Sequence, residues 1–313
     1  MAIYIIHFPN GECSPILDAM TNTIYAVAGV TGHTGSVAAE TLLAQGKKVR
    51  FIVRDAAKGA PWQAKGAEVA IASLDDTAAL TRALTGVAGA FLLIPPDVTT
   101  ATPIESNAKL SALLATVGRA AKVPHVVFLS SVGAQHAAGT GPIKALHRAE
   151  ADLAATGTAL TAVRAAYFQE NWGSSLGMLA QGVLPTFIPS DVRYPQVATR
   201  DIGRTIAAAL VEGGAAGTKQ VIELAGPRDY TGAEVAAALA TITGKPVTAQ
   251  NAPLEAVVPT FTSFGLSAAV AEQFREMYEG IAAGIVACEG GAARQVRGSV
   301  EVEDTLRGLL SAG

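Results

Sequence analysis

IYAVAGVTGHTG, at residues 24–35, is the stretch of sequence that decides the fold. It opens with a short apolar run typical of a buried strand, and the residues after Gly35 have the composition of a helix. Between them, Gly29, Gly32 and Gly35 follow the pattern G-x-x-G-x-x-G. Such glycines permit a sharp turn, close approach to a pyrophosphate, and tight packing of helix on strand. The stretch therefore predicts a dinucleotide-binding loop, followed by a helix whose amino end faces the phosphates.

The same alternation continues along the chain. Further apolar runs, rich in β-branched residues and bounded by turn residues, are predicted as strands at 49–53, 68–72, 90–94, 126–129 and 160–165. Helix-like segments separate them at 36–45, 76–84, 104–121 and 143–155. Buried strands that alternate with helices predict an α/β fold, built as a Rossmann-type doubly wound parallel sheet.

Three segments are expected along the chain. Residues 1–22 show no clear periodicity, which indicates an N-terminal extension before the domain proper. Residues 23–170 are expected to form the Rossmann core, and residues 171–313 a smaller, mostly helical C-terminal lobe that completes the same domain. Within this lobe, residues 201–211 are predicted as a helix capped by Asp201.

Composition limits the partners of the chain. Half of the 313 residues are hydrophobic, which is enough for a large buried core. The net charge of −3 and the lack of a basic run argue against a nucleic-acid partner. No apolar run reaches ~18 residues, so no membrane span is expected. Cys13 and Cys288 have no Cys or His neighbours, so we expect no metal site and reduced thiols in a cytoplasmic protein.

The end of the second predicted strand bears on the choice of cofactor. In NAD-specific folds of this type, an acidic residue at that strand end binds the ribose 2′-hydroxyl. Here the strand ends in Arg54, with Asp55 after it. An arginine suits a 2′-phosphate because its guanidinium pairs bidentately with phosphate oxygens. The sequence therefore predicts NADP(H) in preference to NAD(H).

A set of motifs together resembles the NmrA-like family of atypical short-chain dehydrogenases and reductases. The motifs are AVAGVTGHTG at 26–35, FIVRDAAK at 51–58, ASLDD at 72–76, FLLIPP at 91–96, VVFLSSVGA at 126–134, VRAAYFQENW at 163–172, VATRDIGRTIAAAL at 197–210 and IELAGPRDYTGAEVAAAL at 222–239. The resemblance covers nearly all of the chain from residue 23 onward. It implies an NADPH-dependent reductase of quinones, dyes or phenolic ethers, or a member that binds dinucleotide and acts as a redox-responsive regulator.

The resemblance also implies positions for the cofactor. Its phosphates would be lined by Gly29, Thr31, Gly32, His33, Thr34 and Gly35. Arg54 would hold the 2′-phosphate, and Asp75 would lie near the adenine. Leu93, Ile94 and Pro95, after the fourth predicted strand, would flank the adenosine ribose and the pyrophosphate. Ser130 follows the fifth predicted strand and is a further candidate for cofactor binding. Tyr167 and Phe168, with Asn171, would lie beside the nicotinamide.

The catalytic signature of ordinary short-chain dehydrogenases is incomplete in this chain. Those enzymes use a Y-x-x-x-K pair, in which the tyrosine protonates the carbonyl oxygen and the lysine lowers the tyrosine pKa. Thr140 stands four residues before Lys144, where that tyrosine would be. Lys144 and His147 lie one turn apart on a predicted helix and are candidate catalytic residues, with Tyr167 as a third. The family lysine falls nearer Leu146, so the match of either residue stays open.

The missing tyrosine favours a particular kind of acceptor. Hydride transfer to a quinone or dye gives a delocalised product that solvent can protonate. Tyr167, Phe168 and Trp172 would suit such a flat ring. We therefore expect an NADPH-dependent reductase with a small aromatic or quinone-like partner, its oligomeric state open. The alternative is a non-catalytic NADP(H) sensor that acts through a protein partner. A sugar epimerase is disfavoured because such enzymes usually need the Y-x-x-x-K pair.

Overall fold

One eight-stranded sheet runs through the computed structural model, which describes residues 23–312. The predicted extension at 1–22 lies outside the described residues. All neighbouring strands are parallel. In spatial order they are β3 (Glu68–Ile71), β2 (Lys48–Val53), β1 (Ile24–Ala28), β4 (Gly89–Leu92), β5 (His125–Ser131), β6 (Ala159–Ala165), β10 (Lys219–Ala225) and β13 (Arg294–Arg297). The strand order reverses between β1 and β4, as in a doubly wound sheet, which confirms the predicted fold class.

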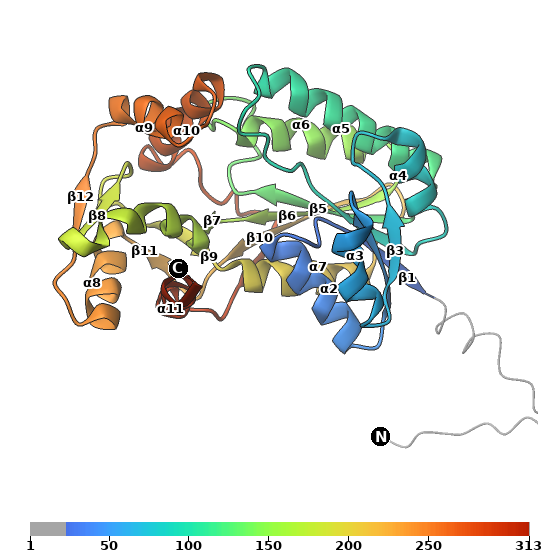
Figure 1. Cartoon of the computed structure of the whole chain (residues 1–313). Coiled ribbons are helices and arrows are strands. Elements are labelled where there is room, and N and C mark those ends of the chain that lie inside the picture. Colours follow the sequence, from blue (N-terminus) through green and yellow to red (C-terminus); the bar gives the residue numbers. More distant parts are fainter. Residues whose placement is uncertain (1–22, 313) are drawn as a thin grey trace, which may run out of the picture.

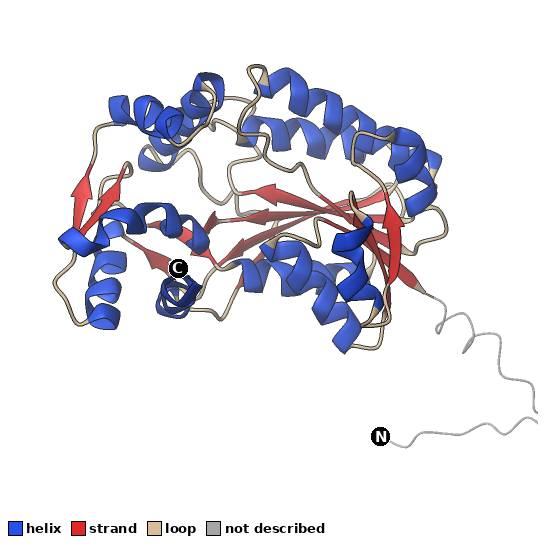
Figure 2. Ribbon diagram, in the orientation of Figure 1, coloured by secondary structure: helices blue, strands red, loops and turns tan. Residues whose placement is uncertain are grey.

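Helices cover both faces of the sheet (Figure 1). On one face lie α2 (His33–Ala44), α3 (Ala56–Gln63) and α7 (Thr199–Glu212). On the other face lie α4 (Thr77–Leu84), α5 (Pro103–Ala120) and α6 (Ile143–Ala154). Figure 2 shows the resulting three layers, with strands between helices. Every residue of β4 and β6 is buried, which is why these strands are continuous apolar runs in the sequence.

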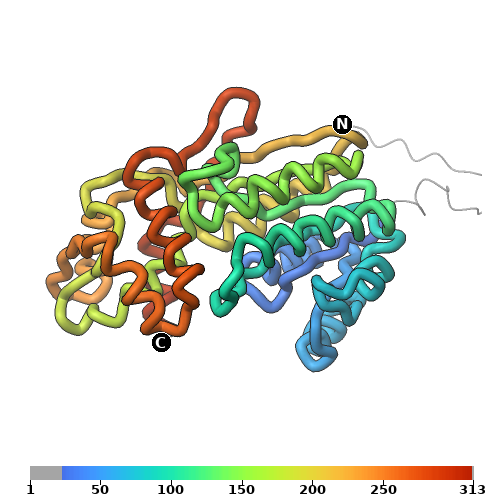
Figure 3. The backbone as a smooth tube through the Cα atoms, turned by 90° about the horizontal axis from the view of Figure 1, so that it is seen from above, coloured from blue at the N-terminus to red at the C-terminus, as the bar shows by residue number. Residues whose placement is uncertain are grey.

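The C-terminal part adds smaller elements at one end of the sheet, seen as yellow-green to red segments in Figure 3. Two small sheets lie there: β7 (Tyr167–Phe168), β9 (Tyr194–Val197) and β11 (Asp229–Tyr230) form one, and β8 (Val183–Thr186) and β12 (Thr248–Asn251) the other. The helical segments are η1 (Gln169–Gln181), α8 (Gly232–Thr243), η2 (Leu254–Ala256), α9 (Val257–Ser263), α10 (Ala268–Ala282) and α11 (Val302–Ala312). Between residues 23 and 312, no helix is both long enough and apolar enough to cross a membrane.

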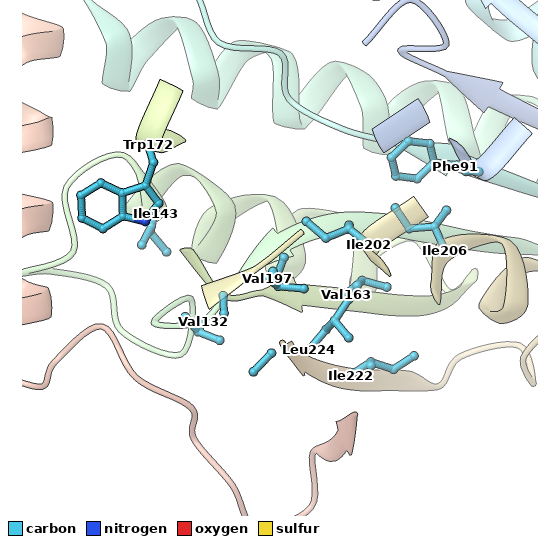
Figure 4. Packing of buried hydrophobic residues seen from close by; sticks show 14 of the residues in the cluster. Phe91, Val132, Ile143, Val163, Trp172, Val197, Ile202, Ile206, Ile222 and Leu224 are labelled. Carbon is cyan, nitrogen blue, oxygen red and sulfur yellow. The ribbon is translucent and has the colours of Figure 1, made fainter. Parts of the chain in front are cut away.

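Helix α7 packs against both the sheet and the neighbouring helix α2. Ile202 and Ile206 of α7 are fully buried in one hydrophobic cluster with Val163 of β6 (Figure 4). Gly203 lets the two helices approach, because a Cβ there would lie 2.6 Å from the Cβ of Val37 in α2. Burial of each large apolar side chain contributes about 1.5–3 kcal/mol, so this cluster fixes α7 and α2 relative to the sheet.

Helix α3 and strand β13 differ from the sequence-based prediction. Helix α3 occupies a stretch where no helix was expected, because Gly59 and Pro61 inside it are poor helix formers. Gly59 is nevertheless required, since a Cβ there would lie 2.6 Å from Cγ1 of Val69 in β3. Strand β13 lies in a segment expected to be mostly helical. Its short polar sequence, RQVR, is that of an exposed strand at the edge of the sheet.

The prediction that Asp201 caps α7 was wrong. Helix α7 begins two residues earlier, at Thr199. The buried Asp201 carboxylate instead accepts hydrogen bonds from the backbone N–H groups of Ser299 (2.8 Å) and Val300 (2.9 Å). A side chain at Gly298 would collide with it, because a Cβ there would lie 2.7 Å from Cγ of Asp201. Asp201 therefore joins α7 to the segment that precedes α11.

Replacement of Gly35 by alanine is expected to destabilise the fold. Its Cβ would lie 2.5 Å from the carbonyl carbon of Gly29, and backbone cannot move aside as a flexible side chain can. Overpacking of this kind costs about 1–3 kcal/mol. The control is Gly118→Ala in α5, where a Cβ meets no atom outside its own helix within 4 Å. That variant should gain up to about 1 kcal/mol. Urea denaturation measures both, and equal stability of the two variants would contradict the assignment.

Candidate functional site

The turn after β1 has the geometry that the glycine pattern predicts. Gly29 has φ +67°, a conformation that suits glycine, and its carbonyl oxygen accepts a hydrogen bond from Gly32 N–H at 2.9 Å. Helix α2 then begins at His33, three residues earlier than expected. The N–H groups of its first turn have no acceptor within the helix, and no side chain caps it. This helix end is therefore free to bind an anion.

The three glycines of the loop have different surroundings. A Cβ on Gly29 would touch Cδ2 of Leu93 at 3.0 Å, and one on Gly35 would collide with the backbone of Gly29. At Gly32 the closest atom to a Cβ would be the Gly29 oxygen, at 3.4 Å, so this position is open. Gly32 is exposed together with its neighbours Thr31 and His33, whereas Thr34 and Gly35 are buried. The space beside Gly32 is thus not filled by the described part of the protein.

Arg54 lies at the end of β2, where a cofactor ribose is expected. Its side chain is exposed and forms no hydrogen bond or ion pair with residues 23–312. The neighbouring Asp55 carboxylate faces the other way, because it accepts a hydrogen bond from Ala57 N–H (2.9 Å) and caps α3. Asp75, beyond β3, is also exposed. Among the described residues, the side chain at the end of β2 that is free to bind a ligand is thus that of the cationic Arg54.

A cavity of about 310 Å³, called here the inner cavity, lies beyond the carboxyl ends of β4, β5 and β6. The segment after β4 connects it to the glycine loop, since Leu93 touches Gly29 while Ile94 and Pro95 line the cavity. Its remaining walls come from α5, α6, α10, β9 and the segments after β5 and β6. The residues that form these walls are Pro96, Asn107, Ser131, Val132, Pro142, Ile143, Ala145, Leu146, Ala166, Tyr167, Phe168, Asn171, Tyr194, Pro195, Phe274, Met277, Ile281 and Val286.

The inner cavity is apolar and carries no charged group among the described residues that line it. Ser131, two asparagines and two tyrosines supply its polar atoms. Burial raises the pKa of Tyr167, and hydrogen bonds with Tyr278 and Asn171 oppose part of that rise. Burial also raises the pKa of Tyr194 well above its usual value. Both phenols are therefore protonated at neutral pH and can donate hydrogen bonds.

Ser130 is turned away from the inner cavity, while Ser131 lines it. The Ser130 hydroxyl donates to Glu150 Oε1 (2.6 Å), and Arg164 Nη2 binds Glu150 Oε2 (2.8 Å). Burial alone would raise the pKa of Glu150, but hydrogen bonds from Arg164, Lys219 and Ser130 bring it below its usual value. This network holds α6 against β6, and each of its buried charges has a partner.

The two predicted catalytic residues of α6 also lie outside the lining of the inner cavity. Lys144 Nζ forms an ion pair with Glu276 Oε2 of α10 at 2.5 Å. Nδ1 of His147 is 2.8 Å from the carbonyl oxygen of Ala134 and hydrogen-bonded to it. The residues of this helix that line the cavity are Ile143, Ala145 and Leu146. Thr140, at the position of the missing tyrosine, is fully buried.

Of the three aromatic residues that were expected to hold the acceptor ring, the structure places two in the lining of the inner cavity and one outside it. Tyr167, Phe168 and Asn171 line the inner cavity. Trp172 does not, because its indole is buried and its Nε1 donates to Gln196 Oε1 at 2.8 Å. Tyr194 is a lining residue that the sequence reasoning missed. It belongs to β9, far along the chain from the other strand ends, and only the pairing of β7 with β9 brings it beside Tyr167.

No group of three or more His, Cys, Asp or Glu within residues 23–312 is arranged to hold a metal ion. Cys288 is exposed and free. The site instead combines an uncapped helix end, an exposed cation at the end of β2 and an apolar cavity, features that dinucleotide sites share.

Comparison with known proteins agrees with this geometry. The chain is 30% identical to an NAD(P)H azoreductase of Xenophilus azovorans over 261 residues, which cover 80% of this chain and 85% of that protein. It is 30% identical to quinone oxidoreductase 2 of Escherichia coli over 267 residues, or 83% of this chain and 88% of the relative. The solved structure of an Escherichia coli NADPH-dependent quinone oxidoreductase with NADPH superposes with a TM-score of 0.78, at 26% identity, and covers 91% of this chain and 99% of the other.

The sequence signature of the NmrA-like family matches residues 20–289, which include the glycine loop and all the residues that line the inner cavity. The chain therefore belongs to the NmrA-like family.

Proposed function

We propose that this protein is an NADPH-dependent reductase of flat conjugated acceptors such as quinones and dyes. The observation that carries the proposal is an uncharged cavity beside a glycine loop at the same edge of the sheet. An uncharged apolar site suits a planar neutral ring. The azoreductase and quinone oxidoreductase relatives support the same class of acceptor.

The cofactor is proposed to lie along the edge of the sheet that is formed by the carboxyl ends of its strands. Arg54 would bind the 2′-phosphate, Asp75 would lie near the adenine, and the loop from Gly29 to Gly35 would bind the pyrophosphate. Leu93, Ile94 and Pro95 would then direct the nicotinamide toward Tyr167 and Phe168. The open space at Gly32 and the uncapped end of α2 are the features that fit a phosphate.

In this proposal the protein mainly positions the cofactor and the acceptor ring, and it does not have to donate a proton. When bound, the reduced nicotinamide supplies a hydride. The apolar walls of the inner cavity exclude water and hold the acceptor ring, and the Tyr167 hydroxyl donates a hydrogen bond. The delocalised anion that follows takes its proton from solvent. Lys144 and His147, already bound to Glu276 and to a backbone carbonyl, are not required as acids.

Arg54→Ala is expected to weaken NADPH binding while leaving NADH binding nearly unchanged. A charged hydrogen bond to phosphate is worth about 1.5–3 kcal/mol, so the affinity for NADPH should fall about tenfold to a hundredfold. Calorimetry with both cofactors measures this. Arg119→Ala, another exposed arginine without an ion pair to the described residues, is the control. Equal affinity of the wild-type protein for NADPH and NADH would refute the preference.

Gly32→Val is expected to abolish dinucleotide binding without loss of the folded state. The nearest protein atom to a Cβ at this position is 3.4 Å away, so the chain tolerates the side chain, but a bound pyrophosphate does not. The measurement is NADPH titration by calorimetry, with circular dichroism to confirm folding. A folded variant that retains full affinity would show that the loop does not bind the pyrophosphate as proposed.

Lys144→Ala and His147→Ala should each keep most of the quinone reductase activity. Loss of a true general acid typically lowers turnover by on the order of a hundredfold or more. Glu276→Gln is the matched control, because it breaks the same ion pair and leaves the lysine in place. A thousandfold fall in kcat for Lys144→Ala, with normal kcat for Glu276→Gln, would establish lysine-assisted proton transfer instead. If the wild-type protein binds NADPH but reduces no acceptor, the sensor alternative becomes the better account.

A further inference from the structure

A second cavity of about 280 Å³, called here the outer cavity, adjoins the inner one. Its walls come from η1, β8, α9 and α10. Tyr167 and Tyr194 line both cavities, so these two side chains form the wall between them. Tyr167 of β7 and Tyr194 of β9 therefore lie between a ring held in the inner cavity and the outer cavity.

The outer cavity is lined by aromatic rings that are already arranged for stacking. Phe187 stacks on Tyr278 with ring centroids 5.6 Å apart and an interplanar angle of 24°. Phe261 meets the edge of Phe187 at 5.9 Å. These offset and edge-to-face geometries are those that aromatic groups prefer, and another ring can join them without rearranging the cluster.

The rim of the outer cavity exposes large apolar side chains. Phe264 is 64% exposed and Met178 is 43% exposed, and both line the cavity. Exposure of an aromatic ring beside an apolar hollow indicates a surface that binds a partner or ligand. The limited volume of the cavity and its continuity with the inner one favour part of a small molecule over a protein segment.

The tyrosine wall has an unsatisfied polar group. Tyr194 is 5% exposed, and its hydroxyl is enclosed and has no hydrogen-bond partner among the described residues. Its ring meets Tyr167 edge to face, with centroids 5.6 Å apart and an angle of 86°. The Tyr194 hydroxyl is therefore free to bind a ligand, whereas the Tyr167 hydroxyl is already hydrogen-bonded with Tyr278 and Asn171. A polar atom of a ligand that passed between the cavities would then satisfy the hydroxyl.

We propose that the outer cavity is a subsite for the second ring of acceptors in which a polar link joins that ring to the reducible ring, as in aryloxy-substituted quinones. The reacting ring lies in the inner cavity, the link accepts a hydrogen bond from Tyr194, and the distal ring packs among Phe187, Phe261 and Tyr278. The inference rests on the proposed reductase function. It adds a site and a structural class of acceptor to that function.

Three quinones with the same reacting ring test the proposal: 1,4-benzoquinone, 2-phenoxy-1,4-benzoquinone and 2-benzyl-1,4-benzoquinone. Phe264→Ser should raise KM about threefold to tenfold for both two-ring compounds and leave KM for benzoquinone unchanged. Tyr194→Phe should raise KM more for the phenoxy compound than for the benzyl compound, since only the phenoxy link has an oxygen. The Tyr194 variant should also keep or gain Tm, because an unpartnered hydroxyl is removed. A merely structural role would lower Tm.

Ile71→Ser is the matched control, because Ile71 is 59% exposed and lines neither cavity. Equal KM changes for one-ring and two-ring quinones in Phe264→Ser would overturn the subsite and leave the reductase proposal intact. A Tyr194→Phe effect on the benzyl compound as large as on the phenoxy compound would overturn the role given to the link. If the wild-type protein reduces none of the three, the reductase proposal fails, and calorimetric binding of the same compounds to the NADP⁺-loaded variants decides the subsite by the same pattern.

Discussion

Helix α2 lies so close to the end of β1 that Gly35 has no room for a side chain above the carbonyl group of Gly29. This backbone contact sets where α2 begins and where its free N–H groups point. Gly203 fixes a second close contact of α2, because the absence of a side chain there lets α7 approach α2 beside Thr34 and Val37. Asp201, in the same turn of α7, then binds the backbone that precedes α11. A chain of close contacts thus links the glycine loop to the C-terminal lobe.

The distribution of charge follows from the same packing. Lys144 is neutralised by Glu276, and Glu150 by Arg164 and Lys219, outside the lining of the inner cavity. A buried ion pair is costly unless its hydrogen bonds are complete, and Glu150 has complete ones, including that from Ser130. The ionisable side chains near the cavity therefore serve to position helices, which leaves the cavity itself apolar. Such a site is better suited to holding rings than to exchanging protons.

The parts of the fold that the sequence predicts are those with a local physical cause. The apolar runs give the central strands, and the glycine spacing gives the loop. Helix α3 escapes prediction because Gly59 and Pro61 oppose helix formation locally, and only contact with Val69 explains the glycine. At the site, the choice between Ser130 and Ser131 depends on which face of β5 each residue occupies. Tyr194 is invisible to sequence reasoning, since it reaches the cavity only through the pairing of two short strands.

Strand β13 has a consequence for the chain during its synthesis. It is the last strand of the large sheet and lies at its edge beside β10. Until Arg294–Arg297 are made, the edge of β10 has unpaired N–H and C=O groups, on which another nascent chain can add a strand. Once in place, β13 presents two charged side chains, Arg294 paired with Glu212 and Arg297 with Asp229. Charged edges resist further strand addition, so this short strand protects the finished sheet from aggregation.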